Sequence, residues 1–231
     1  MKVALVTAAG RGMGEAIARA LHGAGYELGL MSIGGGAQEL AAELGCFGFT
    51  GSITAPADLE RFVQEAVDRY ERIDAVVNNT GHPPKGELLE IPDSDWHLGL
   101  DLILLNVIRM ARLVAPLMVK QGSGAFVNIS TFAAFEPSLD FPVSSSLRAA
   151  LGSFAKLFSD RYASANIRMN NVLPGYIDSY PEDPELVAKI PMGRYGTVDE
   201  VAKTTRFLLS EEAGYITGQN IRVDGGITRS I

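Results

Sequence analysis

The fold of this chain is decided by the stretch Thr7-Ala8-Ala9-Gly10-Arg11-Gly12-Met13-Gly14. An apolar run typical of a strand, Lys2–Thr7, leads into it, and a helical pattern follows from Gly12 to about Gly23. Glycines at such a turn let backbone N–H groups approach a pyrophosphate, and the start of the helix adds partial positive charge. A glycine cluster alone also fits an ordinary tight turn. The strand before it and the helix after it favour a nucleotide-binding loop.

The rest of the chain alternates short apolar runs with helical patterns. Strands are expected at Glu27–Met31, Ile73–Asn78, Ala125–Ile129, Ile167–Leu173 and Asn220–Val223. Helices are expected at Gln38–Leu44, Ser94–Met118, Leu147–Tyr162 and Val198–Leu209. Such alternation implies right-handed βαβ units and a parallel sheet covered on both faces. Because no repeat or linker interrupts it, we expect a single α/β domain over residues 1–231, with a Rossmann-type doubly wound parallel sheet.

Composition narrows the function classes. The 231 residues are 47% apolar and 20% charged, as in an ordinary soluble domain, and the net charge of −7 argues against nonspecific nucleic-acid binding. The single Cys46 excludes an intramolecular disulfide and leaves no thiolate cluster for a metal. No uninterrupted apolar run approaches the roughly 20 residues of a membrane span. With no signal-peptide cleavage site at the N-terminus, the cytoplasm is the expected compartment, and neither a membrane nor a nucleic-acid partner is expected.

Five segments together resemble one family. The glycine loop is similar to the Thr-Gly-x-x-x-Gly-x-Gly loop of the short-chain dehydrogenases/reductases. Four later segments resemble that family's motifs in the same order: Asn78-Asn79-Thr80-Gly81, Pro174-Gly175-Tyr176-Ile177-Asp178-Ser179, Ile190-Pro191-Met192-Gly193-Arg194-Tyr195-Gly196 and Thr217-Gly218-Gln219-Asn220-Ile221-Arg222-Val223-Asp224-Gly225-Gly226. Within the family, the chain most resembles the 3-oxoacyl-carrier-protein reductases. The resemblance implies hydride transfer between a nicotinamide cofactor and a small carbonyl or alcohol substrate.

The resemblance also implies which residues bind the cofactor. They are Thr7, Arg11, Gly12, Met13, Gly14, Ser32, Ile33, Ser52, Asn79, Gly81, Arg148, Pro174, Gly175, Ile177 and Ser179. An acid at the end of the second strand would bind the ribose 2′-hydroxyl of NAD(H), but Ser32-Ile33 stands there. Ser52 replaces an Asp that commonly meets the adenine, and Ala8 replaces the first loop glycine. We expect NADP(H) to be preferred over NAD(H), with its 2′-phosphate near Arg11 and Ser32; a solvent-facing Arg11 is the alternative.

The catalytic positions of the family all differ in this chain. The family uses a tyrosine to exchange the proton, a lysine to lower the tyrosine pKa and hold the ribose, a serine to orient the oxygen, and an asparagine to hold a relay water. An ungapped match places Thr131 on the serine, Ser144 on the tyrosine and Arg148 on the lysine. Ile103 falls on the asparagine, with Asn106 one helical turn later. The family's proton relay is therefore expected to be absent.

The replacements keep part of the chemistry. Thr131 keeps a hydroxyl, and Arg148 keeps a positive charge in a fork geometry unlike that of an ammonium. Ser144 lacks the acidity of a phenol, which ionises near about pH 10. Another group must then supply the proton, and Tyr176 and His82 stand on loops expected near the nicotinamide. Lining of the substrate pocket is the alternative role for both.

Three hypotheses follow. The first, which we prefer, is an atypical ketone reductase, because the nucleotide loops, Arg148 and Thr131 are kept. The second is a redox-inactive nucleotide-binding homologue that serves as a sensor or partner subunit. The third is a non-redox enzyme; the halohydrin dehalogenases resemble this chain in having an arginine at the lysine position. They keep the tyrosine and lack the glycine loop, which is the reverse of this chain, so this hypothesis ranks last.

Two further expectations concern the substrate and the assembly. Residues 179–192 are expected to form a short lid over a pocket that admits a bulky or extended ketone. The resemblance implies a homotetramer or homodimer joined through Ser94–Met118 and Leu147–Tyr162. The second of these helices carries small residues on or near a face: Ala149, Ala150, Gly152 and Ala155.

Overall fold

The computed structural model describes residues 1–230 and contains one seven-stranded parallel sheet with the order β3-β2-β1-β4-β5-β6-β7. The strands are β1 (Lys2–Thr7), β2 (Tyr26–Ser32), β3 (Phe47–Thr50), β4 (Ala75–Asn78), β5 (Gly124–Ile129), β6 (Ile167–Pro174) and β7 (Asn220–Val223). The order reverses at β1, which lies between β2 and β4. Ligands of such sheets bind beyond the carboxyl ends of the strands at this reversal. The expected doubly wound parallel sheet is confirmed.

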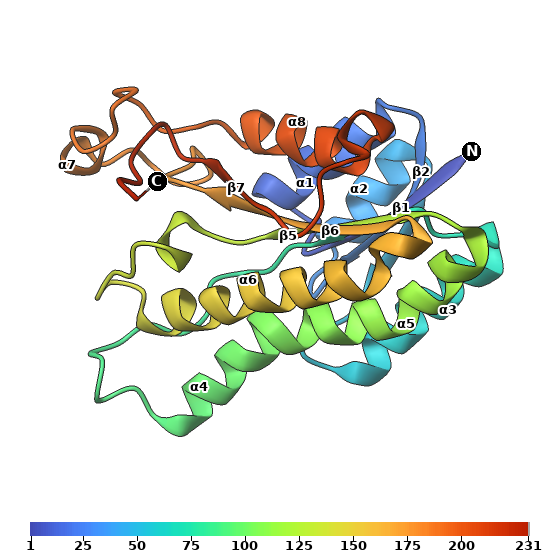
Figure 1. The fold of residues 1–231 in the computed structure, drawn as a ribbon, viewed down its shortest axis with the longest axis horizontal. Helices are drawn as coiled ribbons and strands as arrows, with labels where there is room; N and C mark the ends of the chain where they lie inside the picture. The colour runs from blue at the N-terminus through green and yellow to red at the C-terminus, as the bar shows by residue number, and fades with distance from the viewer. Residues whose placement is uncertain (231) are drawn as a thin grey trace.

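Helices cover both faces of the sheet (Figure 1). On one face lie α1 (Gly12–His22), α2 (Gly36–Leu44) and α8 (Val198–Leu209), and on the other lie α3 (Pro56–Tyr70), α4 (Asp93–Leu100), α5 (Asn106–Gln121) and α6 (Pro142–Tyr162). Successive strand side chains point to opposite faces. Ala4 and Val6 therefore pack in the core beneath α1, whereas Leu5 packs in the core on the α3 side.

Three elements differ from the sequence expectation. Helix α6 begins at Pro142, five residues before the expected Leu147. The proline suits the first turn of a helix. Three consecutive serines, which are weak helix formers, follow it closely at 144–146, so the sequence pattern does not reveal where the helix begins. The sequence pattern assigned neither β3, which has four residues, nor α3. Helix α3 buries Leu59, Phe62, Val63 and Ala66, a helical spacing that could have revealed it.

Helices α4 and α5 form one long apolar element. They join through a π-helical segment, Asp101–Leu105, to give a continuous helix Asp93–Gln121 whose most apolar window has a mean hydropathy of 1.9. By length and composition this helix could cross a membrane. Its inner face, however, packs in the core beneath the sheet, where Met110, Val114 and Met118 are fully buried. It is a core helix of the fold.

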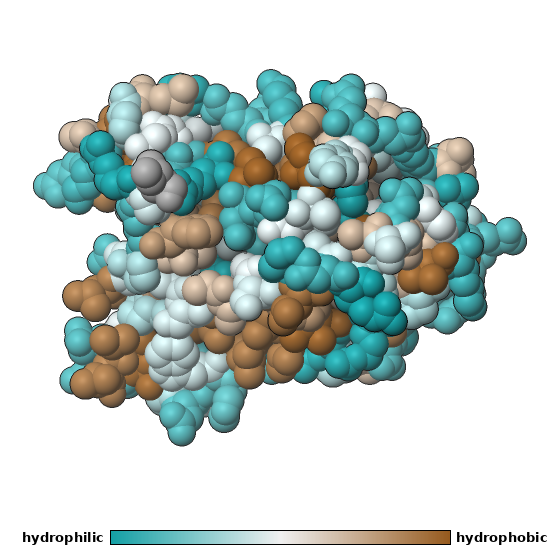
Figure 2. Space-filling model, viewed as in Figure 1, coloured by the Kyte–Doolittle hydropathy of each residue, from teal (hydrophilic) through white to brown (hydrophobic). Residues whose placement is uncertain are grey.

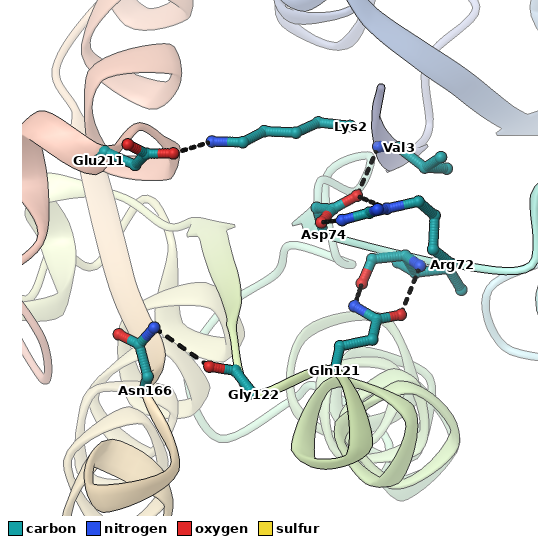
Figure 3. Close-up of polar contacts among 9 residues, drawn as sticks. Lys2, Val3, Arg72, Asp74, Gln121, Gly122, Asn166 and Glu211 are labelled. Atoms are coloured by element: carbon teal, nitrogen blue, oxygen red, sulfur yellow. Dashed lines mark hydrogen bonds and ion pairs between the residues drawn. The ribbon is translucent and has the colours of Figure 1, made fainter.

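Polar contacts join elements at the amino ends of the strands, the end of the sheet opposite the motif loops (Figure 3). Asp74 accepts from the backbone N–H of Val3 at 2.8 Å and pairs with Arg72. The Gln121 side chain bonds both backbone groups of Ile73. These bonds join β1, β4 and α5 without involving any predicted site residue. The contacts at the amino ends of the strands therefore stabilise the fold.

Candidate functional site

The ends of β1 and β4 are locked together by Thr7 and Asn79. Thr7 Oγ1 donates to the Asn79 carbonyl at 2.7 Å and accepts from the Asn79 N–H at 3.0 Å. The Asn79 side chain in turn donates to the Ala8 carbonyl at 3.2 Å. These bonds link two motifs that lie far apart in the sequence. They hold the glycine loop in a defined conformation at β1, where the strand order of the sheet reverses.

The glycine loop leaves its backbone uncovered. A Cβ atom on Gly14 would fall 2.1 Å from the Ala8 carbonyl oxygen and 2.8 Å from Asn79 Nδ2, so only glycine fits there. Gly12 has φ +58°, and a Cβ there would lie 3.7 Å from Ser179 Cβ. The loops after β1 and β6 therefore face each other, as a dinucleotide held by both requires. This cradle, closed to side chains and opening at the first turn of α1, fits a pyrophosphate.

Ala8 adopts a conformation that its residue type disfavours. Its φ of +47° lies in the left-handed region, where a Cβ costs energy and glycine does not. The resemblance places a glycine at this position. The loop here keeps the glycine-like backbone in spite of the substitution.

The expected 2′-phosphate contacts differ in availability. Ser32 Oγ donates to the Gly34 carbonyl at 2.7 Å and accepts from the Ala37 N–H at 3.0 Å, so it is engaged in the turn into α2. Arg11 is exposed and makes no side-chain hydrogen bond or ion pair within residues 1–230. Ser52 donates its N–H to Asp58 at 2.8 Å and bonds Thr54, which orders the entry to α3. Arg11 is the free cation of this group.

Ser144 and Arg148 are brought together by α6. Because the helix begins at Pro142, the two residues lie one turn apart on it, and Arg148 Nε donates to Ser144 Oγ at 3.2 Å. Arg148 Nη1 donates to the carbonyl of Ile129, the last residue of β5. Arg148 is 7% exposed, and burial lowers the pKa of its guanidinium to about 10. Within residues 1–230 it is a buried cation whose hydrogen bonds go to neutral oxygens.

Thr131 lies next to this pair, two residues beyond Ile129. Its hydroxyl accepts from the Ala133 N–H at 3.4 Å and so caps a short 3-10 turn, Phe132–Ala134. The oxygen has only this long bond within residues 1–230. Its hydroxyl hydrogen makes no bond there and remains available to a ligand.

The position of the family's relay asparagine is apolar. Ile103 is 2% exposed and packs in the core within the π-helical segment. The side-chain amide of Asn106 donates to the Leu102 carbonyl, while its Oδ1 is buried without a partner within residues 1–230. The Asn106 amide thus hydrogen-bonds a backbone carbonyl in the irregular turn of its own helix.

The two candidate proton donors stand in different surroundings. The Tyr176 ring lies 5.6 Å from the ring of Phe132 and 5.6 Å from that of Tyr195, and its pKa is raised, mainly by burial. The exposed His82 ring meets Tyr180 edge-on at 5.5 Å. Partial burial lowers the His82 pKa, as do the nearby charges of Lys85 and Arg148. Tyr176 is therefore protonated and His82 neutral near pH 7.

Sequence reasoning missed two features beside the site. Four asparagines form a row of hydrogen bonds across β4, β5, β6 and β7, each bond being 2.8 Å long: Asn78, Asn128, Asn171 and Asn220. An asparagine in each of four strands was the available signal. The second feature is Glu136, which accepts from the N–H groups of Arg229 and Ser230 and holds residues 227–230 against the loop after β5.

A surface groove of about 600 Å³ lies elsewhere, between α1 and α8, and touches the glycine loop only at Gly12. Its charged lining is mixed, with Glu15, Asp199, Arg19 and Lys203 among the residues. The residues with distinctive chemistry gather instead at the carboxyl ends of β4, β5 and β6, so we place the site there.

Comparisons with known proteins show which proteins the chain resembles. A family model described as enoyl-(acyl carrier protein) reductase matches residues 7–228. The chain is 31% identical to the 3-oxoacyl-(acyl-carrier-protein) reductase of Escherichia coli (strain K12), over 98% of this chain and 97% of that protein. It is 34% identical to nodulation protein G of Rhizobium sp. (strain N33), over 97% and 96%. It is 30% identical to the 2-dehydro-3-deoxy-D-gluconate 5-dehydrogenase of Bacillus subtilis (strain 168), over 97% and 94%.

Proposed function

The chain belongs to the short-chain dehydrogenase/reductase family, and from that premise we propose that it reduces ketones with NADPH through an altered proton relay. The observation that carries the proposal is the buried Arg148–Ser144 pair at the end of β5. A cation and a hydroxyl held together at this place suit a carbonyl oxygen that becomes negative during reduction. When bound, the nicotinamide supplies the hydride.

The chain's own residues supply hydrogen-bond donors to the substrate and the cofactor. Because Arg148 Nε donates to Ser144 Oγ, the serine keeps its own hydrogen for a substrate oxygen. Thr131 offers a second hydroxyl. Arg148 Nη2 has two N–H groups, enough for one cofactor hydroxyl and one substrate oxygen. Fixed donors of this kind stabilise developing negative charge without having to reorganise.

Tyr176 is the proton donor in this proposal, and His82 is the second candidate. An alkoxide is a much stronger base than a phenolate, so a tyrosine with a raised pKa still gives its proton to the reduced oxygen. The lowered pKa of His82 leaves little imidazolium at neutral pH. The Tyr176 ring contacts Phe132, which follows Thr131 in the sequence. This contact supports the proposal that Tyr176 lies near the reacting carbonyl.

The pH dependence of kcat distinguishes the two donors. With Tyr176 as donor, we expect kcat to stay flat from about pH 6 to about pH 9, because the phenol remains protonated throughout. Tyr176→Phe should lower kcat about 10²-fold, the usual scale for loss of one general acid. His82→Ala, as the matched change, should alter kcat by less than about threefold.

Two outcomes would contradict the assignment to Tyr176. If kcat rises as the pH falls below the ordinary histidine pKa of 6.5, and His82→Ala abolishes that rise, the imidazolium is the donor. If Ser144→Ala abolishes turnover while Tyr176→Phe and His82→Ala remain active, the serine itself is the acid.

The preferred cofactor in this proposal is NADPH, held at its 2′-phosphate by Arg11. We expect the dissociation constant to be lower for NADPH than for NADH. Arg11→Ala should weaken NADPH binding about tenfold, the loss of one charge-assisted bond, and leave NADH binding unchanged. Arg19→Ala is the control, because Arg19 lies on α1, the helix that Arg11 precedes, but is already paired with Glu15 and Glu43. Tighter binding of NADH, or an Arg11→Ala variant with unaltered NADPH affinity, would refute the preference.

A redox-inactive nucleotide-binding protein is the second candidate function, and the apolar Ile103 at the relay position favours it. Turnover separates the two. Purified protein is mixed with NADPH and a panel of ketones that includes a 3-oxoacyl thioester and an oxo acid, and NADPH oxidation is followed. Oxidation with any ketone supports the reductase. Binding of NADPH without oxidation across the panel supports the second candidate.

We also propose a homo-oligomer joined through α5 and α6. Apolar atoms gather over the middle of these helices in Figure 2. Leu157, on α6, is 64% exposed. The small residues of α6 do not share one face as expected: Ala149 and Ala150 are exposed, Gly152 faces Asn220 and Ala155 is buried. The larger apolar side chains, rather than a small-residue stripe, therefore support the contact.

Light scattering tests the oligomer. At micromolar concentration we expect the mass of a dimer or tetramer of this 24.7-kDa chain. Leu157→Glu should shift the mass toward the monomer, because it places a charge within an apolar contact. Leu139→Glu is the control, since Leu139 is 79% exposed on the loop before α6. A monomeric wild type would refute the assembly.

A further inference from the structure

Arg148 has no acidic partner among the residues that the structure describes, 1–230. Its guanidinium donates to the Ile129 carbonyl and to Ser144 Oγ, both neutral, and it forms no ion pair within residues 1–230. Burial is the cause of its lowered pKa, and no carboxylate acts against that effect. A buried charge without a counter-charge is costly. The structure keeps this charge all the same, so we look for the group that balances it.

The neighbouring residues do not provide the balance. In the family arrangement the residue paired with this cation is a phenol, which can ionise. Ser144 stands there instead, and an alkyl hydroxyl does not ionise at physiological pH. Lys85 lies close to the start of α6, with its Nζ 4.6 Å from the centre of the Phe141 ring. It adds a second positive charge, and both cations lower the pKa of His82.

The carboxylates near the site face another side chain. Asp140 and Asp183 act on Tyr176, whose pKa they help to raise, and neither contributes to the pKa of Arg148. The Asp183 carboxylate accepts from the N–H of Glu185 at the start of α7 (Pro184–Val187). Because no carboxylate within residues 1–230 balances Arg148, we look to a ligand for the negative charge.

The free donors at Arg148 have a defined arrangement. Nε and Nη1 are occupied, whereas Nη2 makes no hydrogen bond within residues 1–230 and is not sealed from solvent. The hydroxyl hydrogen of Ser144 is free beside it, because Ser144 Oγ accepts from Nε. A charged N–H and an O–H side by side match two neighbouring oxygens of one planar anion.

We propose that the substrate is a 2-oxo acid, bound through its carboxylate to Arg148 Nη2 and through its ketone oxygen to Ser144. This assignment rests on the proposed reductase function. The carbonyl carbon takes the hydride and its oxygen takes a proton from Tyr176. The products are a 2-hydroxy acid and NADP⁺, with the carboxylate unchanged. The rings of Phe132, Tyr176 and Tyr195 lie together beside the site and suit a bulky group on the far side of the ketone.

A matched pair of substrates tests the charge. Benzoylformate and methyl benzoylformate share the ketone and the aromatic ring, and neither can form an enolate. We expect wild type to reduce the acid with a kcat/KM about 10- to 100-fold above that of the ester, the range for one charge-assisted bond. Arg148→Gln should remove this preference, and Arg148→Lys should retain part of it. Lys85→Gln, which removes the outer cation, should change the preference by less than about threefold.

The outcomes separate the substrate class from the reductase function. If wild type reduces the ester as well as the acid, the 2-oxo acid assignment is wrong and the reductase stands. If Lys85→Gln loses the preference as fully as Arg148→Gln, the general field selects the anion and Arg148 does not. If neither compound is reduced, the reductase function fails for this pair, and benzoylformate binding to the enzyme–NADPH complex is measured by fluorescence quenching. Binding that Arg148→Lys keeps and Arg148→Gln loses supports the anion site, and absence of binding overturns it.

Discussion

Arg148→Gln is expected to lower kcat/KM for ketone reduction about 10³-fold, the upper range for removal of one donor that stabilises a developing oxyanion. The loss is large because, within residues 1–230, Arg148 is the only cation bonded to Ser144, and it is bonded also to the end of β5. Glutamine keeps hydrogen-bonding groups but not the charge. Steady-state NADPH oxidation with the best ketone of the panel measures the effect.

The fold should tolerate this change. Since Arg148 has no acidic partner, its removal leaves no unpaired buried charge behind. We therefore expect thermal unfolding close to that of wild type, and Arg148→Lys should have intermediate activity. Arg161→Gln is the control, because Arg161 is an exposed arginine on the same helix. Activity of Arg148→Gln within about tenfold of wild type would contradict the role given to the guanidinium.

Gly14→Ala is expected to abolish NADPH binding. The new Cβ would fall 2.1 Å from the Ala8 carbonyl oxygen, and no flexible side chain can move aside there, because the contact is with backbone. The loop must shift, and the bond from Asn79 to Ala8 that shapes the phosphate cradle is lost with it. Titration of NADPH fluorescence measures the loss.

Gly23→Ala is the matched control for this variant. Gly23 follows the same helix, and a Cβ there would meet its nearest neighbour at an ordinary 3.4 Å. We expect unchanged NADPH affinity for Gly23→Ala, and a circular dichroism spectrum close to that of wild type for both variants. A Gly14→Ala variant with the wild-type dissociation constant would show that the cofactor does not use this loop.

Much of the fold can be predicted from the sequence because the patterns that specify strands, helices and turns are local. Alternating apolar runs and helical patterns determine βαβ units, and their fixed handedness determines a doubly wound sheet. The glycine loop could be placed for the same reason, since strand, turn and helix adjoin. The start of α6 was missed because weak helix formers follow Pro142. Without that start, the hydrogen bond between Ser144 and Arg148 could not be foreseen.

Other parts of the site depend on contacts between distant segments. The engagement of Ser32 with the turn into α2 arises from local geometry that residue type alone does not specify. The lock between Thr7 and Asn79 requires β1 and β4 to be neighbours. The burial of Arg148 without an acid follows from the packing of α6 against β5. Such features need the three-dimensional arrangement.

The central claim is hydride transfer to a ketone, and isotope transfer tests it most directly. Wild type is incubated with NADPH that carries deuterium at the transferable position of the nicotinamide, together with a ketone from the panel, and the product is analysed by mass spectrometry. The account predicts an alcohol with one deuterium on the carbinol carbon, and none in reactions with the Gly14→Ala variant. NADPH bound by wild type with no labelled alcohol from any ketone of the panel would contradict it.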